Sequence, residues 1–468
     1  MGNRPGGFIY KLRHRKSHKS TTVVKPASFD VPPIENTNLE TFVLVWLDPN
    51  VDTSQENVQT QIRLREILTC LITFDRVKAC EDWLKKCSPN EKIILIVSGA
   101  YGQEIVPRIH DTPLIIAVYV YCLDVQRNEI WAKNFPKIRS VQSSTANLLR
   151  ELSQNQYKLE NVEDSKALQI YQGTEQVYSL DMKTASLIWY QLLLEILISP
   201  GYLSSRATNQ ELLGIFRQYN SDDQYGSHLI DEFERTYQPT QAVVWLIRNT
   251  LLGRAVNKAL REQDIHMIFP LRFLLIDIHK QLIEHQAPSL NVFKFQLMSQ
   301  AQMEDLRAHP GQLVVIHGFL FAVTNGVQLM STVTHNDQYE TVLLDIKADY
   351  RPGVAPFAFV RHIDRNLQAE MDREVLFMCG SVFEVGSLQY NGSIWTLQLR
   401  LVGESDIPIL SNMKQKLKDN RQLNMIADLL RQCDLNDKAN QLLQRLEYES
   451  NEEARRKNSK LVLSKVDT

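Results

Sequence analysis

Two acidic residues and one lysine are the side chains of this sequence whose types and positions could do chemistry. Asp372 and Glu374 stand one residue apart, directly before the apolar stretch 375–377, and Lys294 stands between Phe293 and Phe295. A carboxylate can stabilise positive charge in a transition state, and an ammonium group can hold a phosphate. Each also has an ordinary interpretation, because a glutamate before a strand often marks only its solvated end and a lysine is mostly a surface residue.

A β-rich segment over residues 291–405 must position these side chains. Strand character is found at 312–321, 340–347, 374–385 and 393–402. The last stretch alternates leucines with polar residues at 397–401, which is typical of a strand with one buried face. We therefore expect this segment to form a β-rich domain with a split sheet, in a chain of multidomain α/β plus α+β class.

The segments around it differ in pattern. Residues 38–150 contain continuous apolar runs at 42–47, 93–97 and 114–121, separated by helical stretches such as 56–71. Such runs indicate buried parallel strands, so we predict an α/β domain of flavodoxin-like type. Residues 151–178 are polar and are expected to be a linker, and 179–290 are expected to be helical. Residues 406–448 predict a helical hairpin similar to one tetratricopeptide unit, and 449–468 a disordered tail.

Charge and composition limit the partners. The net charge is −2, which gives no electrostatic case for nucleic acid, except at a basic leader over 1–37 that we expect to be a solvated, disordered segment. No apolar run approaches the about 20 residues that span a bilayer, so no membrane partner is expected. The six cysteines lack a pairing pattern or metal-ligand spacing, which favours reduced thiols in the cytosol and no metal.

Several common catalytic motifs are absent. The sequence contains no G-x-G-x-x-G, no phosphate-loop motif, no H-E-x-x-H, no C-x-x-C and no G-x-S-x-G. One loop, Ser98 to Gly102, follows a predicted strand and could offer backbone N–H groups to an anion, with Asp48 and Asp124 at neighbouring strand ends. The structural alternative is that the glycines allow a tight turn and the aspartates cap helices.

The β-rich segment resembles arginine-specific, NAD-dependent ADP-ribosyltransferases. The residues that carry the resemblance are Phe293-Lys294-Phe295-Gln296, then 319–323 (Phe-Leu-Phe-Ala-Val), 356–360 (Pro-Phe-Ala-Phe-Val) and 372–377 (Asp-Arg-Glu-Val-Leu-Phe). The family has an aromatic-Arg-Gly strand, a Phe-Leu-Ser-Thr-Ser strand and a Glu-x-Glu before an apolar strand. The order of segments also resembles multidomain members with an α/β segment in front and a helical-repeat segment behind.

The resemblance implies a reaction and a role for each position. The family transfers ADP-ribose, a glycosyl group, from NAD as substrate to an arginine of a protein acceptor. Glu374 matches the catalytic glutamate that stabilises the oxocarbenium-like ribosyl cation. Asp372 stands where a glutamate guides the acceptor, and Lys294 stands where an arginine holds phosphate. Phe295, Gln296 and Phe321 fall at the cofactor strands, so the expected site consists of Glu374 and Asp372 with Lys294, Phe295, Gln296 and Phe321.

The sequence departs from the family at most of these positions. Lys294 keeps the charge of the arginine but lacks its bidentate fork, and Phe295 replaces a glycine. The stretch 321–323 replaces Ser-Thr-Ser and has no hydroxyl. Two hypotheses follow: a degenerate transferase with weak or no activity, or a non-catalytic scaffold that uses its α/β and helical segments for protein partners. Either implies a protein acceptor or partner, and both expect Glu374 in a cleft between two sheets, across from Lys294.

Overall fold

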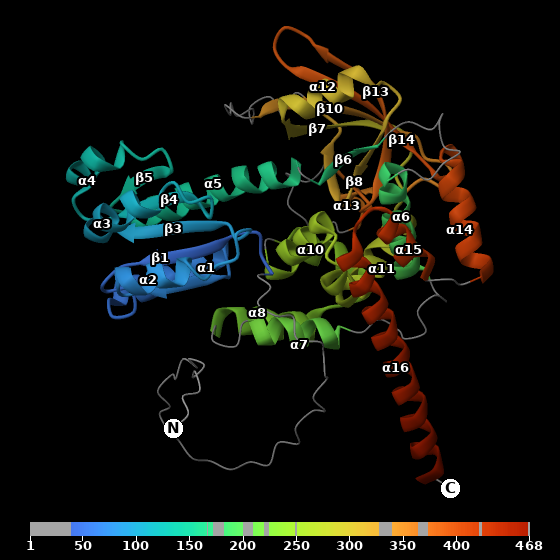
Figure 1. Cartoon of the computed structure of the whole chain (residues 1–468), viewed down its shortest axis with the longest axis horizontal. Coiled ribbons are helices and arrows are strands. Elements are labelled where there is room, and N and C mark those ends of the chain that lie inside the picture. The colour runs from blue at the N-terminus through green and yellow to red at the C-terminus, as the bar shows by residue number, and fades with distance from the viewer. Residues whose placement is uncertain are drawn as a thin grey trace, which may run out of the picture. The chain divides into compact units, whose positions relative to one another are not determined.

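The computed structural model of the chain describes residues 39–165, 167–171, 182–199, 209–219, 224–248, 250–326, 339–363, 373–420 and 424–466. The basic leader expected over 1–37 lies outside these residues, as does Asp372. Within them the chain forms a parallel sheet, a larger mixed sheet and a set of helices (Figure 1).

The first sheet confirms the prediction of a parallel α/β segment. Its strands are β1 (Val43–Leu47), β2 (Leu71–Phe74), β3 (Ile93–Ser98), β4 (Ile115–Tyr121) and β5 (Ile138–Gln142), in the order β2-β1-β3-β4-β5. All pairings are parallel. The helices that link and follow them are α1 (Gln55–Ile67), α2 (Val77–Leu84), α3 (Gly99–Ile109), α4 (Val125–Ala132) and α5 (Thr145–Ser165).

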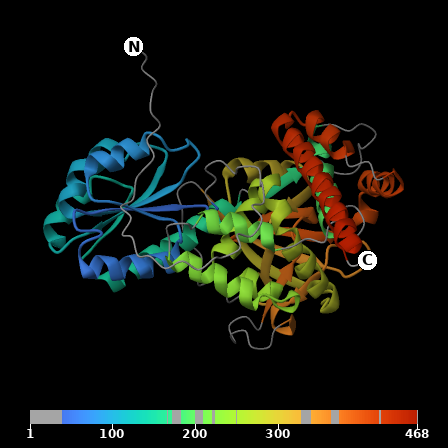
Figure 2. The ribbon, with the colours of Figure 1, turned by 90° about the horizontal axis from the view of Figure 1, so that it is seen from below.

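Helices cover both faces of this sheet, which explains its continuous apolar runs. Val43, Val45 and Leu47 pack on the side of α2 and α3, whereas Leu44 and Trp46 pack on the side of α1 and α5. Consecutive strand residues point to opposite faces, so both faces must be apolar when both are covered. Figure 2 shows the helices on the two sides of the sheet.

The prediction of a linker over 151–178 is wrong for residues 151–165 and 168–171, which form regular secondary structure. Residues up to Ser165 continue α5, and residues 168–171 form β6 (Leu168–Tyr171), an edge strand of the second sheet. The polar composition reflects a helix with one exposed side, because Leu152 and Gln156 are buried on its other side. Residues 172–178 lie outside the described residues.

The described residues of 179–290, where helices are expected, contain six α-helices, the last of which ends at Glu284. These are α6 (Met182–Ile198), α7 (Gln210–Tyr219), α8 (Gln224–Thr236), α9 (Ala242–Ile247), α10 (Leu251–Glu262) and α11 (Ile265–Glu284). α11 packs against α6, α9 and α10 and is the central helix of the group. Ile268, Leu274, Leu275 and Ile278 of α11 are fully buried.

The second sheet holds the β-rich segment. Its strands in chain order are β6, β7 (Leu290–Met298), β8 (Leu313–Ile316), β9 (Leu320–Val323), β10 (Glu340–Ala348), β11 (Phe357–Phe359), β12 (Glu374–Phe377), β13 (Ser381–Tyr390) and β14 (Trp395–Val402). In the described part of the chain their order is β11-β12-β9-β7-β10-β14-β13-β8-β6. The short helices α12 (Gln300–Ala308) and α13 (Val360–Ile363) lie between strands in the chain. The stretch 312–321, expected to have strand character, contains β8 and the start of β9, and the stretch 374–385 contains β12 and the first half of β13.

The sheet is weakly joined between β7 and β9. Phe293 and Val323 are the one pair that links these strands, whereas β7 pairs with β10 over nine positions. The sheet therefore divides at this point into a short part, β11-β12-β9, and a long part from β7 to β6. In place of the predicted split sheet, the described residues form one nine-stranded sheet with a single residue pair at this junction.

The C-terminal helices contain the predicted hairpin. α14 (Pro408–Asn420) precedes α15 (Asn424–Gln432) and α16 (Asn436–Val466), whose facing leucines and alanine are buried. The expectation of a disordered tail from 449 is wrong, because α16 continues to Val466 (Figure 1). Buried ion pairs hold the helix to its neighbours: Glu449 accepts from Arg272 of α11, and Arg445 donates to Glu211 of α7. These partners are distant in sequence, so the local composition did not reveal them.

A buried ion pair also connects the α/β segment to the helices. Glu40 and Arg254 of α10 form this pair, and Arg254 also donates to Thr69 Oγ1 at 2.9 Å. All six cysteines are free. In the described part of the chain, no helix combines the length and apolar character needed to cross a membrane.

Candidate catalytic site

The four stretches that carry the resemblance contain adjacent strands, with 356–360 holding β11 beside β12. Lys294 is on β7, residues 320–323 form β9, and Glu374 is the first residue of β12. In the sheet these strands are neighbours in the order β12-β9-β7, although up to 80 residues separate them in the chain. The sequence order alone does not require this arrangement.

The strand register aligns Glu374 with two apolar residues. Glu374 is directly opposite Val323 of β9, and Val323 is opposite Phe293 of β7. Residues directly opposite in a ladder share one face of the sheet. The three side chains therefore form a row, in which no neighbour of Glu374 can donate a hydrogen bond from its side chain.

Lys294 lies on the other face of β7. Successive strand residues alternate in direction, so Lys294 projects away from the face of Phe293. It is on the same face as Val292 and Met298, which belong to the core of the sheet. The register at the junction places Lys294 and Glu374 on opposite faces of the sheet. It therefore does not place this amine across a cleft from the Glu374 carboxylate, as the sequence predicted.

A small cavity opens where β7 and β9 diverge beyond their single pair. Its volume is about 60 Å³, and its lining includes Lys294 and Gln296 of β7, Phe321 of β9, and Asp164 and Arg261 from helices. Glu374 does not line it. The structure thus brings together three of the expected cofactor residues, Lys294, Gln296 and Phe321, and leaves the expected catalytic acid outside their cavity.

Asp164 is the acid next to Lys294. Burial lowers the pKa of the Lys294 ammonium, and the nearby Asp164 carboxylate opposes this effect. Asp164 also accepts a hydrogen bond from Arg261 at 3.1 Å, and Arg261 donates to Thr41 Oγ1 at 2.7 Å. Glu160 also interacts electrostatically with Asp164 and Arg261, so two acidic side chains accompany the two cations Lys294 and Arg261.

Glu374 is half-buried with little electrostatic compensation. Burial raises the pKa of its carboxyl group. Among the described residues, none forms a hydrogen bond or an ion pair with this carboxylate. A carboxylate in this state keeps its negative charge free for a cation that forms beside it, but nothing described fixes its orientation.

The remaining expected residues are placed as follows. Gln296 is buried, with 5% of its surface exposed, beside Lys294. Phe295 projects from the opposite face of β7, across from Leu343 of β10. Asp372 lies outside the described residues, so the structure gives no position for the second acid.

Sequence reasoning missed three charged residues around this site. Asp164 and Arg261 come from α5 and α10, more than 30 residues before Lys294, and no motif marks them. Asp345 of β10 is opposite Phe293, so it continues the row of Glu374 on the other side, and burial raises the pKa of its carboxyl group. The alternation in 340–347 could have placed Asp345 on a face, but not beside this particular strand.

In the first sheet, the glycine after β3 and the aspartates near the ends of β1 and β4 have structural roles in packing, capping and turns. Asp124 caps α4, since its Oδ1 accepts from the Arg127 N–H at 3.0 Å, and Asp48 Oδ1 accepts from the Asn50 N–H at 2.7 Å. A Cβ on Gly99 would lie 2.6 Å from Asn128 Nδ2, so the glycine allows close packing of α3 against α4. Among the described residues, no group of three His, Cys, Asp or Glu could hold a metal ion.

Comparisons with known proteins give matches among solved structures only. No protein-family model and no curated protein matches the sequence. Plx2a, an ADP-ribosyltransferase toxin from Paenibacillus larvae, is 15% identical over 41% of this chain and 96% of its own, with a TM-score of 0.28. The ADP-ribosyltransferase HopU1 of Pseudomonas syringae pv. tomato is 11% identical over 52% of this chain and 97% of its own, with a TM-score of 0.27. At such low scores these structures assign no role to any residue here.

Proposed function

We propose that residues 290–402 are an ADP-ribosyltransferase-type core in which Glu374 keeps the catalytic position while the nucleotide site has degenerated. The observation that carries the proposal is the adjacency of β12, β9 and β7, which brings the three motif stretches side by side. A chance likeness of short motifs would not require three neighbouring strands. The proposed ancestral reaction is transfer of ADP-ribose from NAD to a protein arginine, and the present protein performs it weakly or not at all.

Glu374 is the residue that retains a role. Its half-buried carboxylate would stabilise the ribosyl cation that forms when the bond to nicotinamide breaks. The family orients this acid with hydroxyls of the neighbouring strand. Here Phe321, Ala322 and Val323 occupy that strand, and none has a hydroxyl. The acid would therefore lack the fixed geometry on which its effect depends.

The phosphate-binding part of the site is obstructed. Lys294 lies in a cavity of about 60 Å³ beside Asp164. Ligand sites for drug-sized molecules measure about 300–1,000 Å³, and a dinucleotide is larger than many such ligands. The rings of Phe319 and Phe321 line the cavity where the two parts of the sheet diverge. NAD would therefore need these rings to move before its pyrophosphate could reach the lysine.

The magnitude of these losses supports a degenerate enzyme. Losing an oriented donor or a phosphate fork costs about 2–4 kcal/mol of transition-state stabilisation each. Two or three such losses reduce the rate by several orders of magnitude, even when they are not fully additive. Asp372, one methylene shorter than the glutamate of the family, is the proposed position for guiding the arginine acceptor.

A transfer assay tests this proposal. Radiolabelled NAD and an arginine-rich acceptor are incubated with the full chain, with Glu374→Ala, and with Glu340→Gln, which changes an exposed acid of the same sheet. We expect all three to label the acceptor at background level. Label at an ordinary enzymatic rate that disappears only in Glu374→Ala would contradict the degenerate site.

A restored variant tests the kinship itself. Lys294→Arg, Phe295→Gly, Phe321→Ser and Val323→Ser together return four of the family residues. Once circular dichroism shows that this variant is folded, we expect NAD cleavage at least about 10-fold above the parent chain, lost again on adding Glu374→Ala. A folded variant without Glu374-dependent cleavage would overturn the assignment of these strands.

We also propose that residues 43–165 form a domain of the flavodoxin-like class. The parallel strand order 2-1-3-4-5 of the first sheet supports this assignment. Fold of this kind does not specify a ligand. We place the protein in the cytosol, with a protein acceptor or partner, on the basis of its free cysteines and the chemistry of the proposed reaction.

A further inference from the structure

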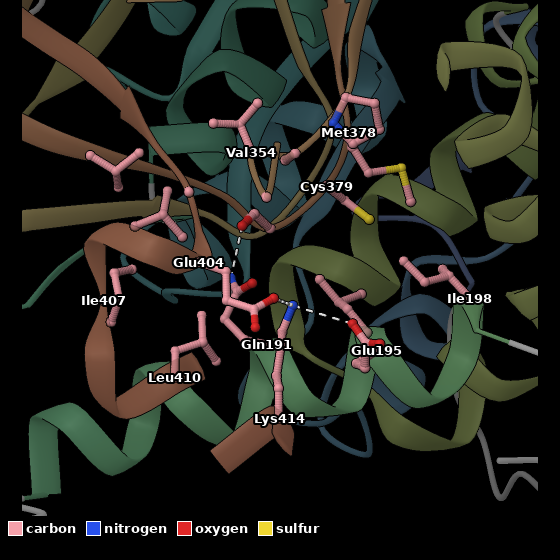
Figure 3. A pocket seen from close by; sticks show the side chains of 18 of the residues that line it. Gln191, Glu195, Ile198, Val354, Met378, Cys379, Glu404, Ile407, Leu410 and Lys414 are labelled. Carbon is pink, nitrogen blue, oxygen red and sulfur yellow. Dashed lines mark hydrogen bonds and ion pairs between the residues drawn. The ribbon is translucent and has the colours of Figure 1, made fainter. Parts of the chain in front are cut away.

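A second cavity lies at the other end of β12 from Glu374. It is lined by Met378, Cys379 and Gly380, which follow the strand, and by residues of α6, α11 and α14 (Figure 3). Met378 is four positions after Glu374, a distance of about 13 Å along an extended chain. We propose that this cavity binds a small ligand with one positive charge and an apolar body, such as an amine attached to a ring.

The size of the cavity selects the size of the ligand. Its volume is about 200 Å³. An apolar cavity of about 150 Å³ holds a benzene ring, so this cavity can hold a ring and one or two further atoms. It is too small for a nucleotide, which separates it from the NAD site of the proposed function.

One wall of the cavity is apolar. Leu194 of α6 lines the space. Figure 3 shows four further apolar side chains around it: Ile198 of α6, Val354 and Met378 of the sheet loops, and Leu410 of α14. Burial of a ring against these groups would remove its surface from water, which is the main favourable term for a small apolar body. The wall therefore fits the uncharged part of the ligand.

The same helices, α6 and α14, also bring charged side chains to the cavity, with an excess of negative charge. Lys414 Nζ lies 3.2 Å from Glu195 Oε2 and 3.4 Å from Glu404 Oε2, so a single ammonium serves two carboxylates (Figure 3). Burial raises the pKa of Glu195, but Lys414, Ser199 and the more distant Lys418 outweigh it, and the pKa lies below its usual value. Burial lowers the pKa of His279, which leaves this neighbour neutral at pH 7. Lys418 is exposed and does not line the cavity, so the lining itself has a formal charge of −1, which a monocation would balance.

The walls are fixed without a ligand. The Glu404 N–H donates to the Gly353 carbonyl at 2.9 Å, and Gln191 Nε2 donates to the Gly380 carbonyl at 2.8 Å. A Cβ on Gly403 would lie 2.8 Å from the Gly353 oxygen, so the two loops approach as closely as glycine permits. A preformed cavity loses less entropy on binding than one that a ligand must open.

Titration calorimetry of the full chain with benzylamine tests the proposal. Benzyl alcohol serves as the neutral ligand of similar shape. We expect saturable benzylamine binding with a Kd on the order of 1 mM, and binding of benzyl alcohol at least about 10-fold weaker. No binding of benzylamine, or equal binding of the two ligands, would overturn the proposal.

Two matched variants locate the site. Glu404→Gln leaves one carboxylate for Lys414, so benzylamine affinity should fall about 10-fold while that of benzyl alcohol is unchanged. Glu384→Gln removes a carboxylate outside the cavity, where it pairs with Arg400, and should change neither. An unchanged benzylamine affinity in Glu404→Gln would place the binding elsewhere and contradict the proposal. These measurements use no NAD, so they stand or fall independently of transfer activity.

Discussion

Glu374 and Val323 lie directly opposite each other in the β12–β9 ladder. The acid that the resemblance selects is thus next to a side chain that cannot hydrogen-bond to it. Burial raises the pKa of this carboxyl group, and no hydrogen bond from the neighbouring strand counteracts the effect. In the proposed reaction, Glu374 would therefore lack a partner that orients its carboxylate.

Val323→Ser should lower the pKa of the Glu374 carboxyl group. A hydroxyl at this position would donate to the ionised form and stabilise it. The measurement is the pH dependence of the Glu374 carboxyl carbon resonance in selectively labelled protein. Val323→Ala provides the matched control without a hydroxyl. If serine and alanine shift the titration equally, the hydroxyl does not reach the acid.

His317→Gln should reduce the loss of stability in weak acid. His317 is fully buried, and burial together with Lys438 lowers its pKa to about 3. An unfolded histidine titrates near pH 6.5. Between these values the unfolded chain binds a proton that the folded chain does not, so stability falls as pH drops below 6.5.

Urea unfolding at pH 7 and pH 5 measures this effect. From pH 7 to pH 5 the histidine should account for about 2 kcal/mol of lost stability in the unmodified chain, and that part should be absent in His317→Gln. The exposed His309 gives the control His309→Gln, which should behave like the parent. If the parent and His317→Gln lose the same free energy of unfolding between pH 7 and pH 5, this histidine is not the cause.

Arg254→Met should destabilise the connection of the α/β segment to the helices. The substitution leaves the buried Glu40 carboxylate without the guanidinium that neutralises it. Breaking a buried ion pair from one side costs about 3–5 kcal/mol. Arg248→Met, which removes an exposed partner of Glu232, should cost less than about 1 kcal/mol. Thermal unfolding compares the two, and similar small losses would mean that the buried pair contributes little.

Gly403→Ala should lower stability because two loop backbones meet at this glycine. The added Cβ would lie 2.8 Å from the Gly353 carbonyl oxygen, and backbone cannot move aside as a flexible side chain does. A loss of about 1–3 kcal/mol is expected for such overpacking. Gly318→Ala, where a Cβ meets nothing within 4 Å, is the control. Equal stability of the two alanine variants in urea would contradict the close approach.

The sequence predicted the elements better than their contacts. The apolar runs of 42–47 and 93–97 identified buried parallel strands, because both faces of that sheet are covered by helices. The alternation at 397–401 identified β14, because one face of that strand is buried in the core and the other is not. In contrast, α5 and the end of α16 were missed, since polar composition is shared by an exposed helix and a disordered segment.

The site could be predicted in part. Short motifs selected Lys294, Phe321 and Glu374, and the register then placed Glu374 on a different face from Lys294. Asp164 and Arg261 could not be predicted, because their position beside Lys294 depends on how α5 and α10 pack against the sheet. The alternation of residue types predicts which side chains share a face of one strand, but it does not predict which distant strands pair.

Titration calorimetry of the full chain with NAD tests the central claim most directly. With the nucleotide site obstructed at Lys294 and Phe321, we expect no saturable heat up to millimolar NAD. Saturable binding in the micromolar range, weakened by Lys294→Met, would show that the cleft still accepts the nucleotide and would contradict the account.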